Sequence, residues 1–596
     1  MTRAARRRLR GIAASPGVAV GPAVLLESRR LPVPRRRLAD AEVATEVARL
    51  HDGLRAARSK LQALHAALPE PQREAYGLIL EAHRLLLEDP MLWTEAERAI
   101  REERIGAAWA VRRTLDHFEE RLGQAESPYL RERCEDLEHV GRLLLRELLG
   151  EAAPGRQLPA GAVLVADDLS PAEAARLLSG ETSHIAALAI ERGSTSSHTA
   201  LLARAHALPA VVGCPGLLAA VDAGERIVVD GLHGEVLLRP DEDEVRSARE
   251  RGRRYASFHG RLRAERPTEP AVTLDGARIC LLVNVEWEAE ADAAVREGAD
   301  GVGLFRTEFL FLGRREPPDE EEQLRRYRAM LRAVAPRPVV LRTVDLGADK
   351  LLGAAASPGA PGVPTGLRGL RLVLHRPELW RAQLRAVLRA AAEGPLRLLL
   401  PMVGGPEELL AARAAISSAA EQLAAEGLEH RVPPVGVMVE VPAAALRAEA
   451  LAAEADFLSV GSNDLVQYTL AAPRDEPAAA TFADPLDPAI VELLDRVAAA
   501  ARRHGRPLTL CGDLAADLHA LPLLLGLGYR RLSVPVASLP LVRAVVRRLR
   551  LEQAEQVARQ ALAAASAAQV RDLLHKRFGP HLGEMWAEQY PGGAGA

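Results

Sequence analysis

Cysteine is scarce in this chain. Among its 596 residues only Cys134, Cys214, Cys280 and Cys511 carry a thiol, and no two of them form a Cys-x-x-Cys pair. This spacing argues against both a disulfide framework and a cysteine zinc site, which need paired or closely spaced thiols. Isolated cysteines are typical of the reducing cytoplasm, and we expect a cytoplasmic protein.

The chain also lacks a charge excess and long apolar runs. Its formal net charge of -3 gives no sign of a nucleic-acid partner. No run of about 20 apolar residues suggests a membrane span. Hydrophobic residues still make up 48% of the chain, and 596 residues are too many for one core. We therefore expect several globular domains.

The first 270 residues predict an α/β domain that is interrupted by helices. Leucines such as Leu50, Leu54 and Leu61 keep one face of a helical pattern, which is typical of a bundle. Short strand-like runs separated by turn signals then predict a small α/β domain. Strand-like residues at the start of the chain have no partner among the helices, so we assign them to that domain. The predicted segments are 1–30 plus 151–240 (α/β domain), 31–150 (inserted helices) and 241–270 (a charged linker helix).

A different alternation begins after residue 270. Eight apolar, strand-like runs are separated mostly by helical stretches. This pattern is typical of a (β/α)8 TIM-type barrel, which we predict over 271–575. We expect 576–596 to be the end of a C-terminal helix and a flexible tail. The strand-like runs are 278–284, 300–305, 338–343, 396–401, 435–440, 456–460, 507–511 and 531–534.

Polar side chains gather where these runs end. In TIM barrels the chemistry takes place at the carboxyl ends of the strands. One charged strand end meeting solvent would be ordinary, but five of the eight runs end in this way. The groups are Arg306-Thr307-Glu308, Arg342 to Asp345 followed by Asp349-Lys350, Glu440, Gly461 to Asp464, and Cys511 to Asp513.

Three arginines and two carboxylates among or near these groups indicate a chemistry. Arg306 and Arg342, with Arg474 further along, supply permanent positive charges. Guanidinium forks match carboxylate and phosphate groups, so a small and highly anionic substrate is indicated. Glu440 and Asp464 supply oxygen ligands. Two carboxylates plus a substrate phosphate usually hold Mg2+, and Mg2+ is the cofactor that we expect.

Two further candidates stand at strand ends. Lys350 is one of only three lysines in the chain, and its compact ammonium group differs from a guanidinium in geometry and hydration. We count it among the substrate-binding candidates. Cys511 could pass a proton to a reacting group. It could also be a small buried hydrophobe, and its position in the sequence leaves both interpretations open.

Residues 193–204, GSTSSHTALLAR, place His198 after five small residues and before a helix-like stretch. Imidazole has an unperturbed pKa of about 6.5, so much of it is neutral and nucleophilic near pH 7. A helix N-terminus beside the ring would supply free backbone N–H groups to a phosphate. Together with an anionic substrate and Mg2+, this histidine indicates phosphoryl transfer.

Longer segments resemble a known family, enzyme I of the bacterial phosphoenolpyruvate:sugar phosphotransferase system. GSTSSHTALLARAHALPAVVG is similar to its phosphohistidine segment, and EAHRLLLEDPML to its helical domain. GADGVGLFRTEFLF, LRTVDLGADK, GVMVEVPAAA, FLSVGSNDLVQYTLAAPRD and CGDLAAD are similar to its barrel signatures. The similarity covers nearly the whole chain, and these motifs are long and occur in the family's order.

The resemblance implies roles for the candidates. A swivelling α/β domain would carry His198 as the phosphorylated residue, and the helical domain would bind the carrier protein HPr. Cys511 would protonate enolpyruvate to pyruvate, and Glu440 would ligate Mg2+ together with Asp464. The barrel domain would form a homodimer. Residues that would bind phosphoenolpyruvate are Arg306, Arg342 and Arg474, with Asn463 and Asp464 beside the phosphate.

Some positions depart from the family pattern. Ser194 replaces a glycine and Ser196 a threonine before His198, and the usual Asn-Pro is missing from 362–371. Asp513 stands where glutamate is usual, and Ala348 where glycine is usual. These changes leave a non-catalytic regulatory scaffold as one alternative. A pyruvate–phosphate dikinase or phosphoenolpyruvate synthase is another, but the chain offers neither a P-loop nor room for an ATP-grasp domain.

Overall fold

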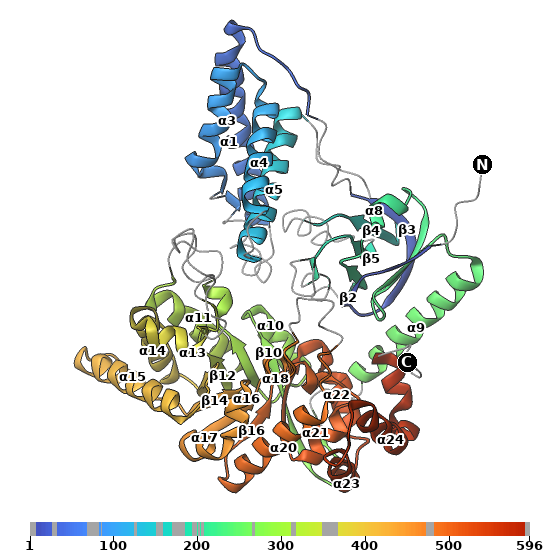
Figure 1. Cartoon of the computed structure of the whole chain (residues 1–596), viewed down its shortest axis with the longest axis vertical. Coiled ribbons are helices and arrows are strands. Elements are labelled where there is room, and N and C mark those ends of the chain that lie inside the picture. Colours follow the sequence, from blue (N-terminus) through green and yellow to red (C-terminus); the bar gives the residue numbers. More distant parts are fainter. Residues whose placement is uncertain are drawn as a thin grey trace. The chain divides into compact units, whose positions relative to one another are not determined.

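The structure of the chain is a computed structural model. It describes residues 7–26, 33–67, 83–84, 86–123, 128–150, 159–169, 185–193, 199–200, 203, 208–264, 269–311, 317–347, 367–472 and 482–589. The chain divides into two compact units (Figure 1). Unit 1 is Met1–Phe258 with Tyr590–Ala596, and unit 2 is His259–Gln589.

Part of unit 1 is a bundle of helices, as the leucine pattern predicts. Figure 1 shows the helices running alongside one another. Their inward faces bury leucine, valine and alanine side chains, among them Leu50, Val111 and Leu144. The helices are α1 (Val43–Ala67), preceded by the 3-10 turn η1 (Asp40–Glu42), α3 (Pro90–Glu103), α4 (Ala107–Gly123) and α5 (Pro128–Leu149).

The rest of unit 1 contains an eight-stranded sheet in the order β1-β8-β7-β3-β4-β5-β6-β2. Strand β3 pairs with β4 in parallel and with β7 in antiparallel orientation, so the N-terminal strands share a sheet with strands that follow the bundle in sequence. The strands are β1 (Arg7–Arg10), β2 (Ile12–Ser15), β3 (Val18–Leu25), β4 (Ala162–Ala166), β5 (Ile185–Ile190), β6 (Ala210–Val212), β7 (Arg226–Asp230) and β8 (Glu235–Leu238). Helix α8 (Leu217–Ala220) lies between β6 and β7 in sequence.

The charged segment that we expect to be a linker helix contains α9 (Glu242–Ala264). Its first turn is acidic, with Glu242, Asp243 and Glu244, which suits the positive end of the helix dipole. The boundary between the two compact units falls within this helix, between Phe258 and His259.

Unit 2 is built around a closed parallel barrel, which confirms the predicted (β/α)8 fold. Strand β10 pairs with both β17 and β11, so the ring of strands closes on itself. The barrel strands are β10 (Arg278–Val285), β11 (Val302–Arg306), β12 (Val339–Arg342), β13 (Leu396–Leu400), β14 (Val435–Val439), β15 (Phe457–Val460), β16 (Leu508–Leu510) and β17 (Arg531–Pro535). A short strand, β9 (Ala271–Val272), pairs with β10 in antiparallel orientation.

Helices follow the barrel strands in the alternation that the sequence predicts. They are α10 (Ala289–Arg296), α11 (Glu320–Val334), α13 (Leu370–His375), α14 (Pro377–Ala391), α15 (Pro406–Ala425), α16 (Pro442–Leu446), α17 (Ala448–Glu454), α18 (Ser462–Leu470), α20 (Pro488–Arg503), α21 (Leu521–Leu527), α22 (Leu539–Val546), α23 (Leu551–Ala561) and α24 (Ala567–Gln589). Three 3-10 turns, η2 (Glu308–Leu310), η4 (Asp513–Ala516) and η5 (Val536–Ser538), follow β11, β16 and β17. In the described part of the chain, no helix is both long enough and apolar enough to span a bilayer.

The C-terminal helix continues past residue 576, where we expect the barrel domain to end. Helix α24 runs unbroken to Gln589 and buries Phe578, Leu582 and Trp586. The indole N–H of Trp586 donates a hydrogen bond to the carbonyl of Leu518 at 3.0 Å. These apolar side chains make the described end of α24 part of the core of unit 2.

A glycine in β14 allows close contact between neighbouring barrel strands. Gly436 lies opposite Phe457 of β15, and a Cβ atom added at Gly436 would lie 2.4 Å from two ring atoms of Phe457. We predict that Gly436→Ala lowers the free energy of unfolding by about 1–3 kcal/mol, because a buried ring must shift. Urea unfolding of the full chain, followed by circular dichroism, measures this change.

The same substitution at Gly583 in α24 is the matched control. A Cβ there meets no atom within 4 Å, so Gly583→Ala is expected to be neutral or to stabilise by up to about 1 kcal/mol. Equal losses of stability in the two variants would contradict the packing argument.

Candidate active site

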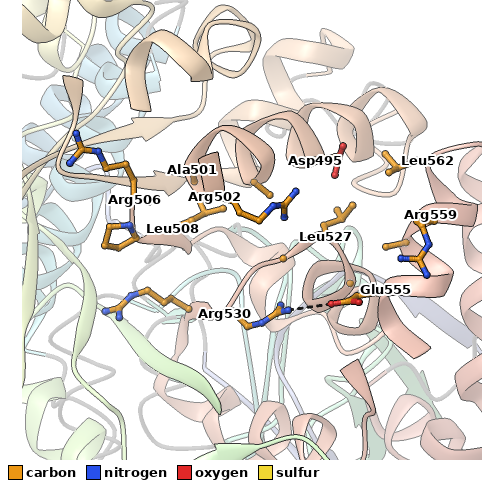
Figure 2. A pocket seen from close by; sticks show the side chains of 16 residues that line it. Asp495, Ala501, Arg502, Arg506, Leu508, Leu527, Arg530, Glu555, Arg559 and Leu562 are labelled. Atoms are coloured by element: carbon orange, nitrogen blue, oxygen red, sulfur yellow. Dashed lines mark ion pairs between the residues drawn. The ribbon is translucent and has the colours of Figure 1, made fainter. Parts of the chain in front are cut away.

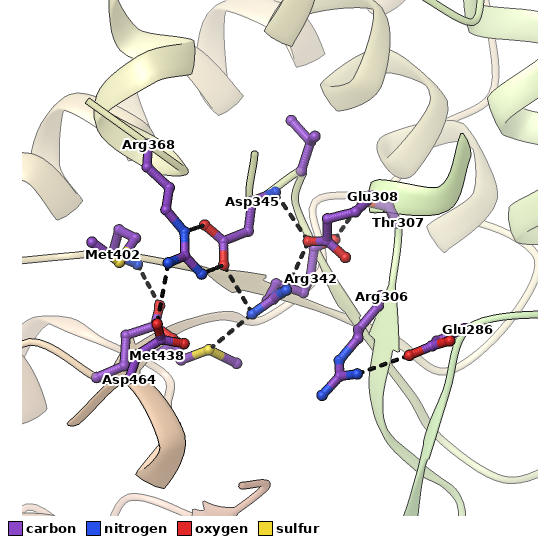
Figure 3. Close-up of polar contacts among 12 residues, drawn as sticks. Glu286, Arg306, Thr307, Glu308, Arg342, Asp345, Arg368, Met402, Met438 and Asp464 are labelled. Atoms are coloured by element: carbon purple, nitrogen blue, oxygen red, sulfur yellow. Dashed lines mark hydrogen bonds and ion pairs between the residues drawn. The ribbon is translucent and has the colours of Figure 1, made fainter. Parts of the chain in front are cut away.

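The polar groups that follow the barrel strands converge at the carboxyl ends of β11, β12, β14 and β15. Figure 3 shows Arg342, Asp345, Arg368 and Asp464 joined in one network of hydrogen bonds and ion pairs. Arg306 lies beside this network. All five belong to unit 2. The barrel thus brings together residues that are more than a hundred positions apart in the sequence, because parallel strands end at a common edge.

Arg306 is the last residue of β11 and the more accessible of the two strand-end arginines. Its Nη1 donates to Oε1 of Glu286, just after β10, at 2.8 Å, and 33% of its side chain is exposed. Figure 3 shows the remainder of the guanidinium group turned away from Glu286. This arrangement leaves a guanidinium edge available to an anion.

Arg342 is buried and held by two carboxylates. Its Nη2 donates to Glu308 Oε1 at 2.8 Å, and its Nη1 lies 3.1 Å from Asp345 Oδ2. Nη1 also lies 3.6 Å from the sulfur of Met438. Burial opposes the positive charge, but Glu308 and Asp345 outweigh it and raise the pKa of Arg342 above its ordinary value. Arg342 is therefore a fixed positive charge in the floor of the site.

Asp345 links Arg342 to a second arginine. Arg368 donates to both Asp345 oxygens, from Nε and from Nη2, each at 2.8 Å. The Asp345 side chain has no exposed surface. Burial alone would raise the pKa of Asp345, but Arg342 and Arg368 hold it below its usual range. A bidentate pair of this kind fixes both the position and the plane of the Arg368 guanidinium.

Arg368 also reaches the acidic side of the site. Its Nη1 donates to Oδ1 of Asp464 at 3.1 Å, and Asp464 lies in the first turn of α18. Asn463 orients the neighbouring loop, because its Oδ1 accepts the backbone N–H of Asp513 at 2.7 Å. These contacts place Asp464 beside Arg368 and Asn463 against the loop that follows β16.

Glu440 is a buried carboxylate with one unused oxygen. Its Oε1 accepts the backbone N–H of Met402 at 2.7 Å, whereas its Oε2 has no hydrogen-bond partner. Burial, and then repulsion from Asp345 and Asp464, raises the pKa of Glu440 to about 8. A cation beside Oε2 would relieve both effects.

The donor set fits a hard divalent cation only in part. Glu440 Oε2 is unpartnered and Asp464 is a neighbouring carboxylate, which matches two protein oxygens. Within the described residues, no group of three or more His, Cys, Asp or Glu side chains could hold a metal. Further ligands would have to come from substrate oxygens or from water, as is usual for Mg2+.

Cys511 lies at the end of β16 and is 2% exposed. Its thiol donates to the carbonyl of Val460 at 3.3 Å and accepts from Ser459 Oγ at 3.3 Å. Burial raises the pKa of Cys511 to about 11, and Glu440 acts in the same direction. The side chain packs in an apolar cluster of the barrel, yet its thiol keeps its proton at neutral pH, so both interpretations of this cysteine stay compatible with the geometry.

Three predicted site residues lie outside the described residues: His198, Lys350 and Arg474. The departures at positions 194, 196, 348 and 362–366 also lie there. Their roles stay predictions. Asp513, which stands where glutamate is usual, is described and exposed beside Asn463.

Sequence reasoning did not single out Glu308, Asp345 or Arg368. The first two stand in strand-end groups that were noted, but nothing in their spacing shows that both hold Arg342. Arg368 follows no strand; it is placed by an isolated bridge to Gly347 and by the positive φ of Gly369 (56°). The Gly-x-Arg-Gly pattern at 366–369 was the available signal, since glycine tolerates a backbone conformation that other residues avoid.

Three family models match the chain. A PEP-utilising enzyme N-terminal model matches residues 10–133, a PEP-utilising enzyme mobile-domain model matches 158–234, and a PEP-utilising enzyme PEP-binding-domain model matches 261–551. The last of these covers the barrel strands and all the residues shown in Figure 3.

Several curated proteins are similar over nearly their whole length. The phosphoenolpyruvate-protein phosphotransferase of Geobacillus stearothermophilus is 35% identical over 579 residues, which cover 96% of this chain and 98% of that protein. The protein of the same name from Cupriavidus necator is 38% identical, over 93% of this chain and 97% of that protein. The one from Haemophilus influenzae is 34% identical, over 95% and 98%.

The buried ion network gives a stability prediction. Asp345→Asn keeps the shape but leaves Arg342 and Arg368 without the carboxylate that both contact. We expect this variant to lower the free energy of unfolding by about 3 kcal/mol, because two buried arginines lose a shared carboxylate and only Glu308 and Asp464 remain to balance them. Urea unfolding of the full chain measures the change.

A surface pair provides the control. Glu492 and Arg496 are 2.9 Å apart on α20, and more than half of each side chain is exposed. Glu492→Gln should therefore cost no more than about 0.5 kcal/mol. A similarly small cost for Asp345→Asn would mean that the network does not stabilise the barrel.

Proposed function

The chain belongs to the phosphoenolpyruvate-protein phosphotransferase family, and on that premise we propose that it transfers the phosphoryl group of phosphoenolpyruvate to its own His198. His198 then passes the group to a histidine of a carrier protein, HPr or an HPr-like protein, as the first component of a sugar phosphotransferase system. Pyruvate is the released product.

One observation carries this proposal. At the carboxyl ends of the barrel strands, an accessible guanidinium (Arg306) lies near a fixed one (Arg342) and a buried carboxylate with a free oxygen (Glu440). Phosphoenolpyruvate carries a carboxylate and a phosphate, so it needs positive charge at both ends. We assign Arg306, Arg342, Arg368 and the undescribed Arg474 to this task. Lys350 would be a further binding residue.

The acidic side of the site is suited to a metal ion. Phosphoenolpyruvate-utilising enzymes need a divalent metal, and we propose Mg2+ held by Glu440 and Asp464. The ion would balance negative charge on the transferring phosphoryl group. Arg368 keeps Asp464 in place through its 3.1 Å contact, and Asn463 holds the adjacent loop beside the phosphate.

Cys511 has the protonation state that the reaction requires. When the phosphoryl group leaves, the bond between phosphorus and the substrate oxygen breaks and the enolate of pyruvate remains. Carbon 3 of that enolate must gain a proton to give pyruvate. A thiol with a raised pKa of about 11 keeps a proton to give at neutral pH, and the resulting thiolate regains one from solvent.

In this proposal His198 must react with two partners, phosphoenolpyruvate and the carrier protein. Its segment belongs to unit 1 and the arginine site to unit 2, so the two units have to approach each other for the first transfer. The helical bundle would bind the carrier for the second transfer. We also propose that two chains pair through the barrel unit and that the protein works in the cytoplasm, which its isolated cysteines favour.

The first test is labelling of the full chain with ³²P-phosphoenolpyruvate and Mg2+. We expect acid-labile, alkali-stable label in the wild type and none in His198→Ala, because phosphohistidine needs the imidazole. Arg306→Ala should lose label through weaker substrate binding, whereas His198→Ala should still bind phosphoenolpyruvate in calorimetry.

His375→Asn is the matched control for this experiment. His375 is an exposed residue at the end of α13 and should keep full label. Wild-type protein that binds phosphoenolpyruvate but takes up no label would contradict the enzyme proposal and favour a regulatory scaffold.

The second test separates the two interpretations of Cys511. We predict that Cys511→Ser slows pyruvate formation by about 10²–10⁴-fold, since the hydroxyl is a much weaker acid than the thiol. A coupled lactate dehydrogenase assay with excess carrier measures the rate. Wild-type activity should show no loss from this group until the pH nears 11.

Cys214→Ser is its control. Cys214 is fully buried in unit 1, and burial raises the pKa of its thiol to about 11 as well. It lies outside the barrel site, so its rate should stay near that of wild type. If Cys511→Ser also keeps the wild-type rate, Cys511 is a packing residue and the proton has another source.

A further inference from the structure

A second concentration of arginines lies at the opposite end of the barrel strands. Figure 2 shows a hollow whose wall includes Arg502, Arg530 and Arg559. It is formed where α20 ends, where β16 and β17 begin, and along α23. Because the strands are parallel, this is the amino end of the barrel, remote from the Arg306 site at the carboxyl ends.

The hollow carries more positive than negative charge. Five arginines line it, against two carboxylates, Asp495 and Glu555. The lining arginines are Arg502, Arg506, Arg530, Arg531 and Arg559. An excess of guanidinium groups in one concave surface attracts anions and matches phosphate oxygens in pairs.

The two carboxylates do little to neutralise these arginines. The Nη2 of Arg530 lies 3.8 Å from Glu555 Oε1, which is a loose ion pair. Only the Nη1 of Arg530 is taken up by backbone carbonyls, those of Leu525 and Tyr529. Burial lowers the pKa of Arg530, and repulsion by Arg502 lowers it further, against the opposing effect of Glu555. An additional negative charge in the hollow would therefore be favourable for Arg530.

The other arginines divide into two kinds. Arg506 is occupied, because its Nε and Nη2 donate to the carbonyls of Ala452 and Ala453. The guanidinium groups of Arg502, Arg531 and Arg559, which line the same hollow, have no hydrogen bond or ion pair with any residue that the structure describes. The Nη1 of Arg502 lies 3.2 Å from where a Cβ of Gly528 would be, and both residues line the hollow.

Apolar side chains complete the wall, so part of the surface of the hollow is hydrophobic. Leu508, Leu527 and Leu562 line it together with Ala498 and Ala558. The cavity volume is about 630 Å3, which lies within the range of small-molecule sites. A single phosphate ion would fill only a small part of this space. The combination suits a ligand with an anionic end and a larger uncharged body.

We propose that this hollow binds a phosphorylated small organic molecule, whose phosphate is held by Arg502, Arg530 and Arg559 and whose body packs on the leucines. The shared chemistry is a phosphate ester on a ring, which a sugar phosphate and a nucleotide both offer. The site is separate from the carboxyl-end site, and the proposal does not rest on the proposed phosphotransferase function.

Calorimetric titration of the full chain at fixed ionic strength tests the proposal with three probes. They are fructose 1,6-bisphosphate, ADP and inorganic phosphate. We expect fructose 1,6-bisphosphate or ADP to bind at least about tenfold more tightly than inorganic phosphate, since only they can use the apolar wall. Which of the two binds more tightly distinguishes a sugar phosphate from a nucleotide.

Two double variants locate the binding. Arg502→Ser with Arg559→Ser should weaken it by about tenfold or more, because charge-assisted hydrogen bonds are lost. Arg496→Ser with Arg503→Ser removes the same charge from outside the hollow, where these arginines pair with Glu492 and Glu449, and should leave it unchanged. Arg306→Ala should also leave it unchanged, which excludes the carboxyl-end site. Unfolding temperatures check that each variant is folded.

Three results would overturn the proposal. One is that neither organic probe binds more tightly than inorganic phosphate. Another is that both double variants weaken binding equally, which would reveal a general attraction of anions to the surface. The third is that Arg306→Ala abolishes binding of the organic probes, which would assign them to the opposite end of the barrel.

Discussion

The Asp345 carboxylate, held between Arg342 and Arg368, is the interaction on which the barrel site depends. It is fully buried, and each of its oxygens contacts a guanidinium group. A buried carboxylate is costly unless it is paired, and a buried guanidinium is equally so. Their mutual compensation allows two positive charges to stand near the strand ends before any substrate arrives. Through Arg368, the same contact also sets the position of Asp464.

Two charged groups keep atoms that this network does not use, and these atoms determine which ions the site can accept. Glu440 keeps an oxygen without a partner, and Arg306 keeps part of its guanidinium directed away from Glu286. One is suited to a cation and the other to an anion. Cys511 lies in the same part of the barrel, where burial keeps its thiol protonated. A partly free guanidinium, an unpartnered carboxylate oxygen and a protonated thiol therefore coexist because each is held in a different local environment.

The barrel uses its two ends differently. At the carboxyl ends, arginines such as Arg342 are closely matched by buried carboxylates. At the amino ends, Arg502, Arg530 and Arg559 outnumber the acids around them and line an open hollow with leucine walls. The first arrangement favours fixed geometry, and the second favours attraction of an anion from solvent. This contrast is why we treat the amino-end hollow as a binding site in its own right.

Much of this organisation is determined by the sequence alone. The alternation of apolar runs and helical stretches after residue 270 predicts the barrel, because a buried parallel strand must be apolar along its length. Because carboxyl ends of parallel strands meet, Arg306, Arg342, Glu440 and Cys511 could be predicted as neighbours from their places after those runs. The composition likewise predicts the absence of disulfides.

Only the tertiary structure decided which side chains pair. Glu308 and Asp345 both hold Arg342, and Arg368 bridges Asp345 to Asp464. These pairings depend on distances between separate elements, which the sequence pattern does not give. The amino-end hollow is a similar case, since its arginines come from two helices and the starts of two strands and form no motif. Hydrophobic periodicity indicates which face of a single helix or strand is buried. Which charged side chains pair depends on contacts between different elements, and these pairs become strong only when packing has removed water from around the charges.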